Sequence, residues 1–199
     1  MAQKYQTILL VGRPGSGKGT IGKALGVIPG FFHMAMGDVF RNLDLSTPLG
    51  QIFVDYSSRG ELVPDDATVQ LWKVTVEAQA ASHRFRPETD LLILDGIPRN
   101  VAQAELMKEH IEVRRAFHLI CTDEAAMMER LRRRALNENR FDDASEEVIR
   151  RRWDVYARET RPIRECYPRE KIEEIDAMAS PARVVHEVLD RLLSLGDVS

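Results

Sequence analysis

The sequence predicts an α/β fold in which the strands of a parallel sheet alternate with helices. Short runs rich in Ile, Leu, Val and Phe recur along the chain, and those at 7–12 and 91–96 are apolar almost throughout. Such runs are typical of strands buried on both faces of a parallel sheet. Helical patterns separate the runs, and this alternation predicts a doubly wound sheet flanked by helices.

The candidate strands and helices can be placed in order along the chain. Strands are expected at 7–12, 31–34, 91–96, 116–120 and, more weakly, 171–177. A helix is predicted over 65–81, because Val69, Trp72 and Val76 recur at helical spacing and Pro64 marks its start. Two more helices are expected from 145 to about 160 and from about 181 to 195. The interval 37–66 is too long for a simple crossover, so it is predicted to be an inserted helical lobe.

Composition excludes several classes of function. A chain of 199 residues fits one domain, and its net charge of -3 argues against bulk attraction to nucleic acid or to an anionic membrane. No run of about eighteen apolar residues occurs, and the first apolar run is too short for a secretion signal. Cys121 and Cys166 lack the spacing of metal ligands and favour a reducing compartment. These observations predict a cytoplasmic protein.

A glycine-rich segment carries the strongest functional signal. Gly12, Gly17 and Lys18 have the spacing of a phosphate-binding loop, between a predicted strand and a predicted helix. Glycines allow positive φ and let successive amides approach an anion, which the dipole of the following helix also favours. Lys18 would reach the β- and γ-phosphates. Gly19 stands where the general pattern has Ser or Thr, and Thr20 follows it.

The loop "GRPGSGKGT" resembles that of the adenylate kinase group of nucleoside monophosphate kinases. Four later stretches match the same family in the same order: "HMAMGDVFR", "RGELVPDD", "LLILDGIPRN" and the arginine-rich stretch at 129–163. The resemblance covers about residues 7–195. It implies one domain over 1–199 with the P-loop NTPase fold and a five-stranded parallel sheet. It also implies an acceptor-binding lobe at 37–66 and a short lid at 133–142.

The resemblance also implies roles for particular residues. Residues that would hold the donor ATP are Gly15, Ser16, Gly17, Lys18, Gly19, Thr20 and Arg134. Residues that would bind the acceptor nucleotide are Asp38, Arg41, Glu61, Val63, Gly96, Arg99, Gln103, Arg140 and Arg152. The implied catalytic residues are Lys18, Arg99, Arg134, Arg140 and Arg152. Asp95 would orient Mg²⁺ through water, Asp38 would cap a short helix, and Asp142 and Asp143 would lie at the edge of the lid.

This set of groups suits phosphoryl transfer, which depends on positioning and on stabilising charge around the transferred group. An acceptor monophosphate is already anionic at its attacking oxygen, so no general base is assigned. The implied reaction is reversible transfer from MgATP to a nucleoside monophosphate, most readily AMP. The expected partners are small nucleotides, with no nucleic acid and no membrane, and the expected state is a monomer.

Three alternatives remain open at this point. A UMP/CMP kinase is the nearest alternative. Asn100 resembles a residue of that branch of the family, and Met36 stands where the family commonly has a threonine near the base. Gln103, in contrast, favours adenine. A P-loop kinase of a small hydroxyl metabolite fits the chain length and the order of the motifs less well. A nucleotide-dependent binding switch is disfavoured by the many arginines carried in the same chain.

Overall fold

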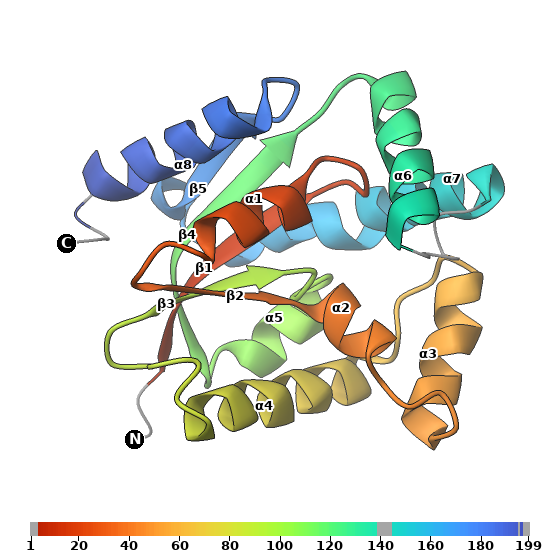
Figure 1. The fold of residues 1–199 in the computed structure, drawn as a ribbon, viewed down its shortest axis with the longest axis horizontal. Helices are drawn as coiled ribbons and strands as arrows, with labels where there is room; N and C mark the ends of the chain where they lie inside the picture. Colours follow the sequence, from red (N-terminus) through yellow and green to blue (C-terminus); the bar gives the residue numbers. More distant parts are fainter. Residues whose placement is uncertain (1–3, 139–144, 195, 197–199) are drawn as a thin grey trace.

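A five-stranded sheet with all strands parallel forms the centre of the protein (Figure 1), which is described here by a computed structural model over residues 4–138, 145–194 and 196. The strands, in their spatial order, are β2 (Phe31–Ala35), β3 (Leu91–Asp95), β1 (Tyr5–Gly12), β4 (Ile111–Ile120) and β5 (Ile172–Asp176). The predicted fold class is therefore confirmed.

Eight α-helices connect and flank the strands within the described residues. They are α1 (Lys18–Leu25), α2 (Met36–Arg41), α3 (Pro48–Ser58), α4 (Asp65–Ala81), α5 (Val101–Met107), α6 (Glu124–Glu138), α7 (Glu146–Val155) and α8 (Pro181–Ser194). A π-helical turn (Tyr156–Thr160) continues α7, and short 3-10 helices follow at Arg161–Cys166 and Arg169–Lys171. The predicted helix from 145 to about 160 is thus α7 followed by a π-turn.

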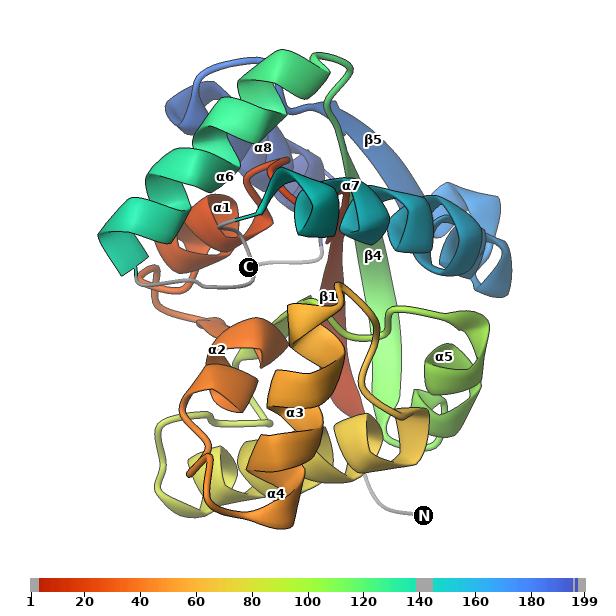
Figure 2. The ribbon, with the colours of Figure 1, turned by 90° about the vertical axis from the view of Figure 1, so that its right-hand side faces the viewer.

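The sheet separates two apolar cores. Ile8 and Leu10 of β1 pack in the core that also contains side chains of α1, α6 and α8, whereas Leu9 packs with Trp72 and Val76 of α4 on the other face. Four consecutive residues of β1, 7–10, are therefore buried, which explains the unbroken apolar run that predicted the strand. Figure 2 shows α1, α6 and α8 together in the upper part of the molecule and α4 and α5 in the lower part.

The largest difference between an observed strand and its prediction lies in β4. β4 begins at Ile111 rather than at residue 116. The interval between β2 and α4 contains α2 and α3, so the chain there is helical.

Cys121 and Cys166 are both free thiols. Across the described ranges, no helix combines the length and the apolar character needed to cross a membrane.

Candidate active site

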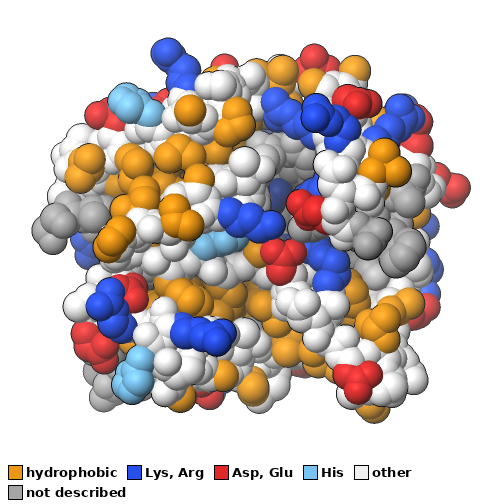
Figure 3. Space-filling model, viewed as in Figure 1, with side chains coloured by type: hydrophobic (Ala, Val, Ile, Leu, Met, Phe, Trp, Pro, Cys, Tyr) orange, Lys and Arg blue, Asp and Glu red, His pale blue; other side chains and the backbone are white. Residues whose placement is uncertain are grey.

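A cavity of about 600 Å³ opens where β1 and β3 end. Its lining comes from several elements: the loop after β1, helix α2, residues 60–63, the loop after β3, and helices α6 and α7. On the face shown in Figure 3, basic side chains lie at the rim and in the depth of a hollow. The carboxyl edge of an open parallel sheet is the usual place for a ligand in folds of this kind.

Most of the site residues predicted from the sequence line this one cavity. They are Gly15, Gly17, Lys18, Gly19, Thr20, Asp38, Arg41, Glu61, Val63, Asp95, Gly96, Arg99, Gln103, Arg134 and Arg152. Ser16 is instead buried beneath the loop, with 2% of its surface exposed. Arg140, Asp142 and Asp143 lie outside the described residues, as does the end of the predicted lid at 139–142.

The loop between β1 and α1 needs glycine at two positions. Gly15 has φ of 90° and Gly17, which immediately precedes α1, has φ of 95°, in the left-handed region that other residues rarely adopt. The loop also folds back tightly, since a Cβ on Gly12 would lie 2.6 Å from Ser16 Oγ. The amino end of α1 therefore faces the cavity, where its unpaired amides and its dipole favour an anion.

Lys18 is the first residue of α1 and lies within the curve of this loop. Its Nζ donates hydrogen bonds to the backbone carbonyls of Gly12, at 2.7 Å, and Arg13, at 3.1 Å. Burial of the ammonium group lowers the pKa of Lys18 from 10.5 to about 8, although part of the residue stays accessible from the cavity. A bound anion would stabilise the charged form and raise this pKa again.

Four charged side chains from later elements also act on the Lys18 ammonium. After burial, the Asp95 carboxylate has the next largest influence and raises the pKa of Lys18, while Arg99, Arg134 and Arg152 lower it. These residues come from β3, the loop after β3, α6 and α7, and all of them line the cavity. Three guanidinium groups and one carboxylate therefore act on the Lys18 ammonium, an arrangement that favours a polyanionic ligand.

The donor set beside the loop suits a hydrated Mg²⁺ ion. Asp95 ends β3, and a Cβ on Gly19 would lie 3.5 Å from its Oδ2, so this carboxylate borders the first turn of α1. Thr20 is exposed and lines the same cavity. Carboxylate and hydroxyl oxygens are suitable ligands for Mg²⁺. Within the described ranges no group of three or more His, Cys, Asp or Glu side chains is placed to hold a metal ion.

Asp38 does not cap a helix, and this prediction was wrong. α2 begins at Met36, directly after β2, and its N-cap is Ala35, which provides no side-chain hydrogen bond. Asp38 is the third residue of the helix, where a carboxylate still suits the helix dipole. Its Oδ1 accepts a hydrogen bond from Arg41 Nη2 at 2.6 Å. The pair therefore places a guanidinium group at the cavity, which the buried Met36 also lines.

The turn after β3 is shaped by its backbone. Gly96 has φ of 82°, and the Ile97–Pro98 peptide bond is cis. A Cβ on Gly96 would lie 3.6 Å from Arg99 Nη2, so the guanidinium folds back over the glycine. The Arg99 carbonyl accepts a hydrogen bond from Thr160 Oγ1 at 2.7 Å. The π-turn after α7 is thereby joined to the loop that carries Arg99.

Gln103 is 1% exposed and yet lines the cavity. Asn100, the N-cap of α5, accepts a hydrogen bond from the Gln103 backbone N–H at 2.8 Å. The side-chain amide of Gln103 accepts from the Arg99 N–H at 2.7 Å and donates to Asp65 Oδ1 at 2.9 Å. The amide is therefore fixed at the wall of the cavity.

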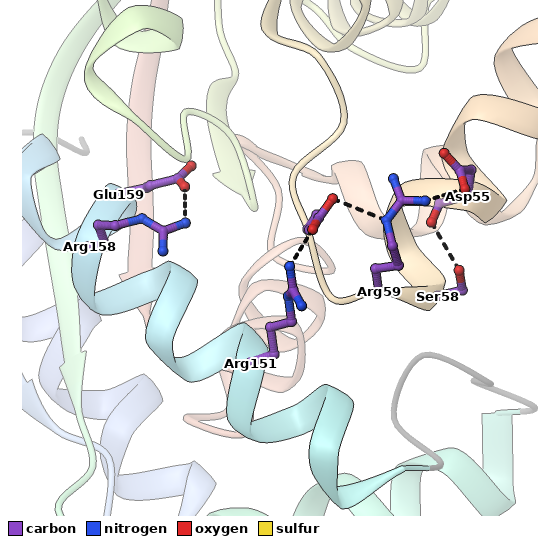
Figure 4. Close-up of polar contacts among 7 residues, drawn as sticks. Asp55, Ser58, Arg59, Arg151, Arg158 and Glu159 are labelled. Atoms are coloured by element: carbon purple, nitrogen blue, oxygen red, sulfur yellow. Dashed lines mark hydrogen bonds and ion pairs between the residues drawn. The ribbon is translucent and has the colours of Figure 1, made fainter.

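Residues 60–63 connect α3 to α4 and touch α7. The Glu61 carboxylate forms ion pairs with Arg59, at 3.2 Å, and with Arg151 of α7. In Figure 4 the side chains of Arg59 and Arg151 point from separate elements toward the carboxylate between them. Val63 is buried at the cavity wall, and its carbonyl accepts a hydrogen bond from Thr68 Oγ1 at 3.3 Å.

The sequence reasoning missed residues whose partners lie far along the chain. Trp153 of α7 is buried, and its Nε1 donates to the Pro14 carbonyl at 3.0 Å. Nothing near Trp153 in the sequence indicates this contact. Phe40 and Phe53, from α2 and α3, stack with ring centroids 5.2 Å apart and both line the cavity. The two residues are thirteen positions apart, so no local pattern indicated that they stack, although both lie within the predicted helical lobe.

Comparison with known proteins gives consistent results. A family model described as adenylate kinase matches residues 10–172. An adenylate kinase of Thermobifida fusca (strain YX) is 35% identical over 194 residues, which cover 94% of this chain and 98% of that protein. An adenylate kinase of Nocardioides sp. is 34% identical over 197 residues, which cover 96% of this chain and 97% of that protein. An adenylate kinase of Thermus thermophilus is 33% identical over 185 residues, covering 90% and 92%.

Proposed function

The chain belongs to the adenylate kinase family, and on that premise we propose that it transfers the γ-phosphoryl group of MgATP reversibly to AMP, giving two molecules of ADP. One observation supports this reaction above the others. A phosphate-binding loop with Lys18 shares a single cavity with the guanidinium groups of Arg99, Arg134 and Arg152 and with the buried amide of Gln103. A site for one phosphate alone would not need positive charge from so many elements.

The donor nucleotide is assigned to the loop after β1. The amides around Gly15, Gly17, Gly19 and Thr20 surround the ATP phosphates, and Lys18 neutralises their charge. Ser16 is buried and its backbone N–H donates to the Arg13 carbonyl at 3.1 Å, so its proposed role is to shape the loop. When bound, Mg²⁺ would be held by Thr20 and, through water, by Asp95, and would neutralise phosphate charge.

The acceptor is assigned to the opposite side of the cavity. Arg41 and Arg99 bind its phosphate, and Asp38 orients Arg41 through their hydrogen bond. Gln103 contacts the base, since its buried amide lines the cavity and can both donate and accept hydrogen bonds. Residues at the wall that complete the acceptor site are Glu61, Val63 and Gly96.

The chemical step follows from these positions. A phosphate oxygen of AMP attacks the γ-phosphorus of ATP, and the bond between that phosphorus and the oxygen of ADP breaks with its electrons passing to ADP. The attacking oxygen is already anionic, so no residue has to remove a proton. Arg134 and Arg152, together with Arg140 from outside the described residues, stabilise the charge on the transferred group. A bidentate guanidinium suits a phosphoryl group better than an ammonium does.

An assay for ADP from MgATP and AMP tests the proposal. We expect Lys18→Met to lower kcat by at least about 10³-fold, because the charge that faces the transferred group is lost. Lys108→Met is the matched control, since Lys108 is exposed and pairs only with nearby Glu105 among the contacts described. Absence of ADP with the wild-type protein, or an unchanged rate in folded Lys18→Met, would refute the proposal.

We further propose that the enzyme acts as a monomer on free nucleotides in the cytoplasm. The free thiols of Cys121 and Cys166 suit a reducing compartment. Light scattering during size-exclusion chromatography tests the oligomeric state, and a mass near 22.6 kDa is expected. A mass of twice that value would exclude a monomer.

A further inference from the structure

The side-chain amide of Gln103 is held in one of its two orientations by partners that cannot exchange roles. Its Oε1 accepts from the backbone N–H of Arg99, and its Nε2 donates to Asp65 Oδ1. A backbone N–H only donates, and an ionised carboxylate only accepts. Turning the amide over would place two donors together at Arg99 and two acceptors together at Asp65.

Asp65 is itself held in place. It is the first residue of α4, and its Oδ1 also accepts a hydrogen bond from Asn100 Nδ2 at 2.8 Å. Asn100 caps α5, the helix that carries Gln103, so the starts of two helices share one network. Because Gln103 is almost fully buried, water could not satisfy a mismatched amide, so the turned-over orientation is disfavoured.

Part of the hydrogen-bonding capacity of the Gln103 amide remains for a ligand in the cavity. A primary amide has two N–H donors and two acceptor lone pairs, and the contacts with Arg99 and Asp65 use one of each. Adenine presents a ring-nitrogen acceptor beside an amino donor. Hypoxanthine and guanine present the reverse, a ring N–H beside a carbonyl oxygen. A glutamine free to turn over could match either kind of base.

We propose that Asp65 and the Arg99 backbone N–H lock the Gln103 amide, so that the site selects a 6-amino purine over a 6-oxo purine in the acceptor. This inference rests on the proposed function, in which Gln103 contacts the acceptor base. Asp65 is a positioning residue, because it acts on the base only through Gln103. The selectivity thus depends on a carboxylate 38 positions away in the sequence.

The wild-type enzyme provides the first test. AMP and IMP differ only in the amino or oxo group at C6 and the proton at N1 that accompanies it. We expect kcat/KM for AMP to exceed that for IMP by at least about 10-fold, as two mismatched hydrogen bonds at a buried amide require. A smaller ratio would overturn the lock, and this measurement needs no variant that could fail to fold.

Asp65→Leu tests the lock itself, and Asp66→Leu is its matched control. Both changes remove one carboxylate from the first turn of α4, but Asp66 is exposed. Leucine has no acceptor for Gln103 Nε2, whereas asparagine would keep an oxygen that Asn100 Nδ2 holds in the same place. We expect the AMP-to-IMP ratio to fall about 10-fold in Asp65→Leu, because only the Arg99 half of the lock remains, and to stay within about twofold in Asp66→Leu.

Gln103→Leu separates failure of the lock from failure of the base contact. If the ratio collapses in Gln103→Leu but is unchanged in Asp65→Leu, then Gln103 contacts the base without the lock and the inference is refuted alone. If neither change alters the ratio, Gln103 does not contact the base, and its assignment in the proposed function fails as well. A fall in both variants, with Asp66→Leu near wild type, supports the inference.

Discussion

The indole N–H of Trp153 donates a hydrogen bond to the backbone carbonyl of Pro14 at 3.0 Å. This contact joins α7 to the loop proposed to hold the ATP phosphates. The Arg13 guanidinium lies 4.8 Å from the centroid of a Trp153 ring and pairs with Glu124 of α6 at 2.9 Å. The loop is therefore held by α6 and α7, the helices that carry Arg134 and Arg152, so a substitution in α7 should alter the donor site.

Trp153→Phe should weaken ATP binding. The substitution removes the indole N–H and leaves the Pro14 carbonyl without this donor, which costs about 1–3 kcal/mol. We expect KM for ATP to rise by about 10-fold, since about 1.4 kcal/mol of lost positioning corresponds to that factor. Steady-state kinetics with varied ATP measures the effect.

Trp72→Phe is the matched control for this substitution. Trp72 is fully buried, and its Nε1 has no hydrogen-bond partner within the part of the chain that the structure describes. The control should lower stability through lost packing while leaving KM for ATP unchanged. An equal rise of KM in both variants would show that Trp153 acts only through general stability.

The lowered pKa of Lys18 predicts a basic limit to activity. The unliganded enzyme loses the Lys18 proton as pH rises through about 8. We therefore expect kcat/KM for ATP to fall above this pH, since kcat/KM reports the free enzyme. Bound phosphates favour the charged ammonium, so the corresponding limit in kcat should lie at higher pH. Lys18→Arg should abolish the limit near pH 8, because arginine stays charged there; a limit that persists would have another origin.

The same pKa shift predicts a pH dependence of stability. The folded pKa of Lys18 lies below its ordinary value of 10.5, so between about 8 and 10.5 the unfolded chain binds more protons than the folded one. The contribution of Lys18 to the free energy of unfolding therefore rises with pH across that interval. Urea unfolding without nucleotide should show this rise in the wild type relative to Lys18→Met. Parallel pH profiles for the two proteins would contradict it.

Arg150 and Arg152 lie two positions apart on α7, but they should respond differently to substitution. Arg152 lines the cavity, whereas Arg150 is exposed and pairs with Glu146 one turn away. We expect Arg152→Gln to lower kcat by at least about 10²-fold, as loss of a charge that stabilises the transferred group does. Arg150→Gln should change kcat by less than about twofold, because an exposed ion pair contributes at most about 1 kcal/mol to stability. Similar losses of kcat in both variants would show that Arg152 does not stabilise the transferred group.

The sequence predicted the elements whose environment is set locally. The strand β1 is buried on both faces, and its continuous apolar run predicted it. The first half of β4 was missed because it pairs with β1 from Ile111 but with β5 only from Ala116. Its charged residues, such as Glu112 and Arg114, remain partly exposed there, so the segment does not have the composition of a buried strand.

Site residues followed the same division. The P-loop was recognisable because its geometry depends on adjacent glycines and one lysine. The cap expected at Asp38 was wrong because β2 runs directly into α2, and only the register of that junction shows where the helix begins. The contact of Trp153 with Pro14 and that of Gln103 with Asp65 depend on how distant elements pack, which no local pattern records.

Helix α1 packs so closely on β2 that one position tolerates only glycine. A Cβ on Gly22 would lie 2.2 Å from His33 Nε2, closer than side chains can approach. Gly22→Ala should therefore lower the free energy of unfolding by about 1–3 kcal/mol, the usual cost of overpacking. In a His33→Ala background the ring is absent, and the same change should be neutral or stabilising by up to about 1 kcal/mol, because alanine favours a helix more than glycine. Urea unfolding of the four proteins gives the coupling between the two sites. An equal cost of Gly22→Ala in both backgrounds would show that the ring of His33 does not impose the glycine.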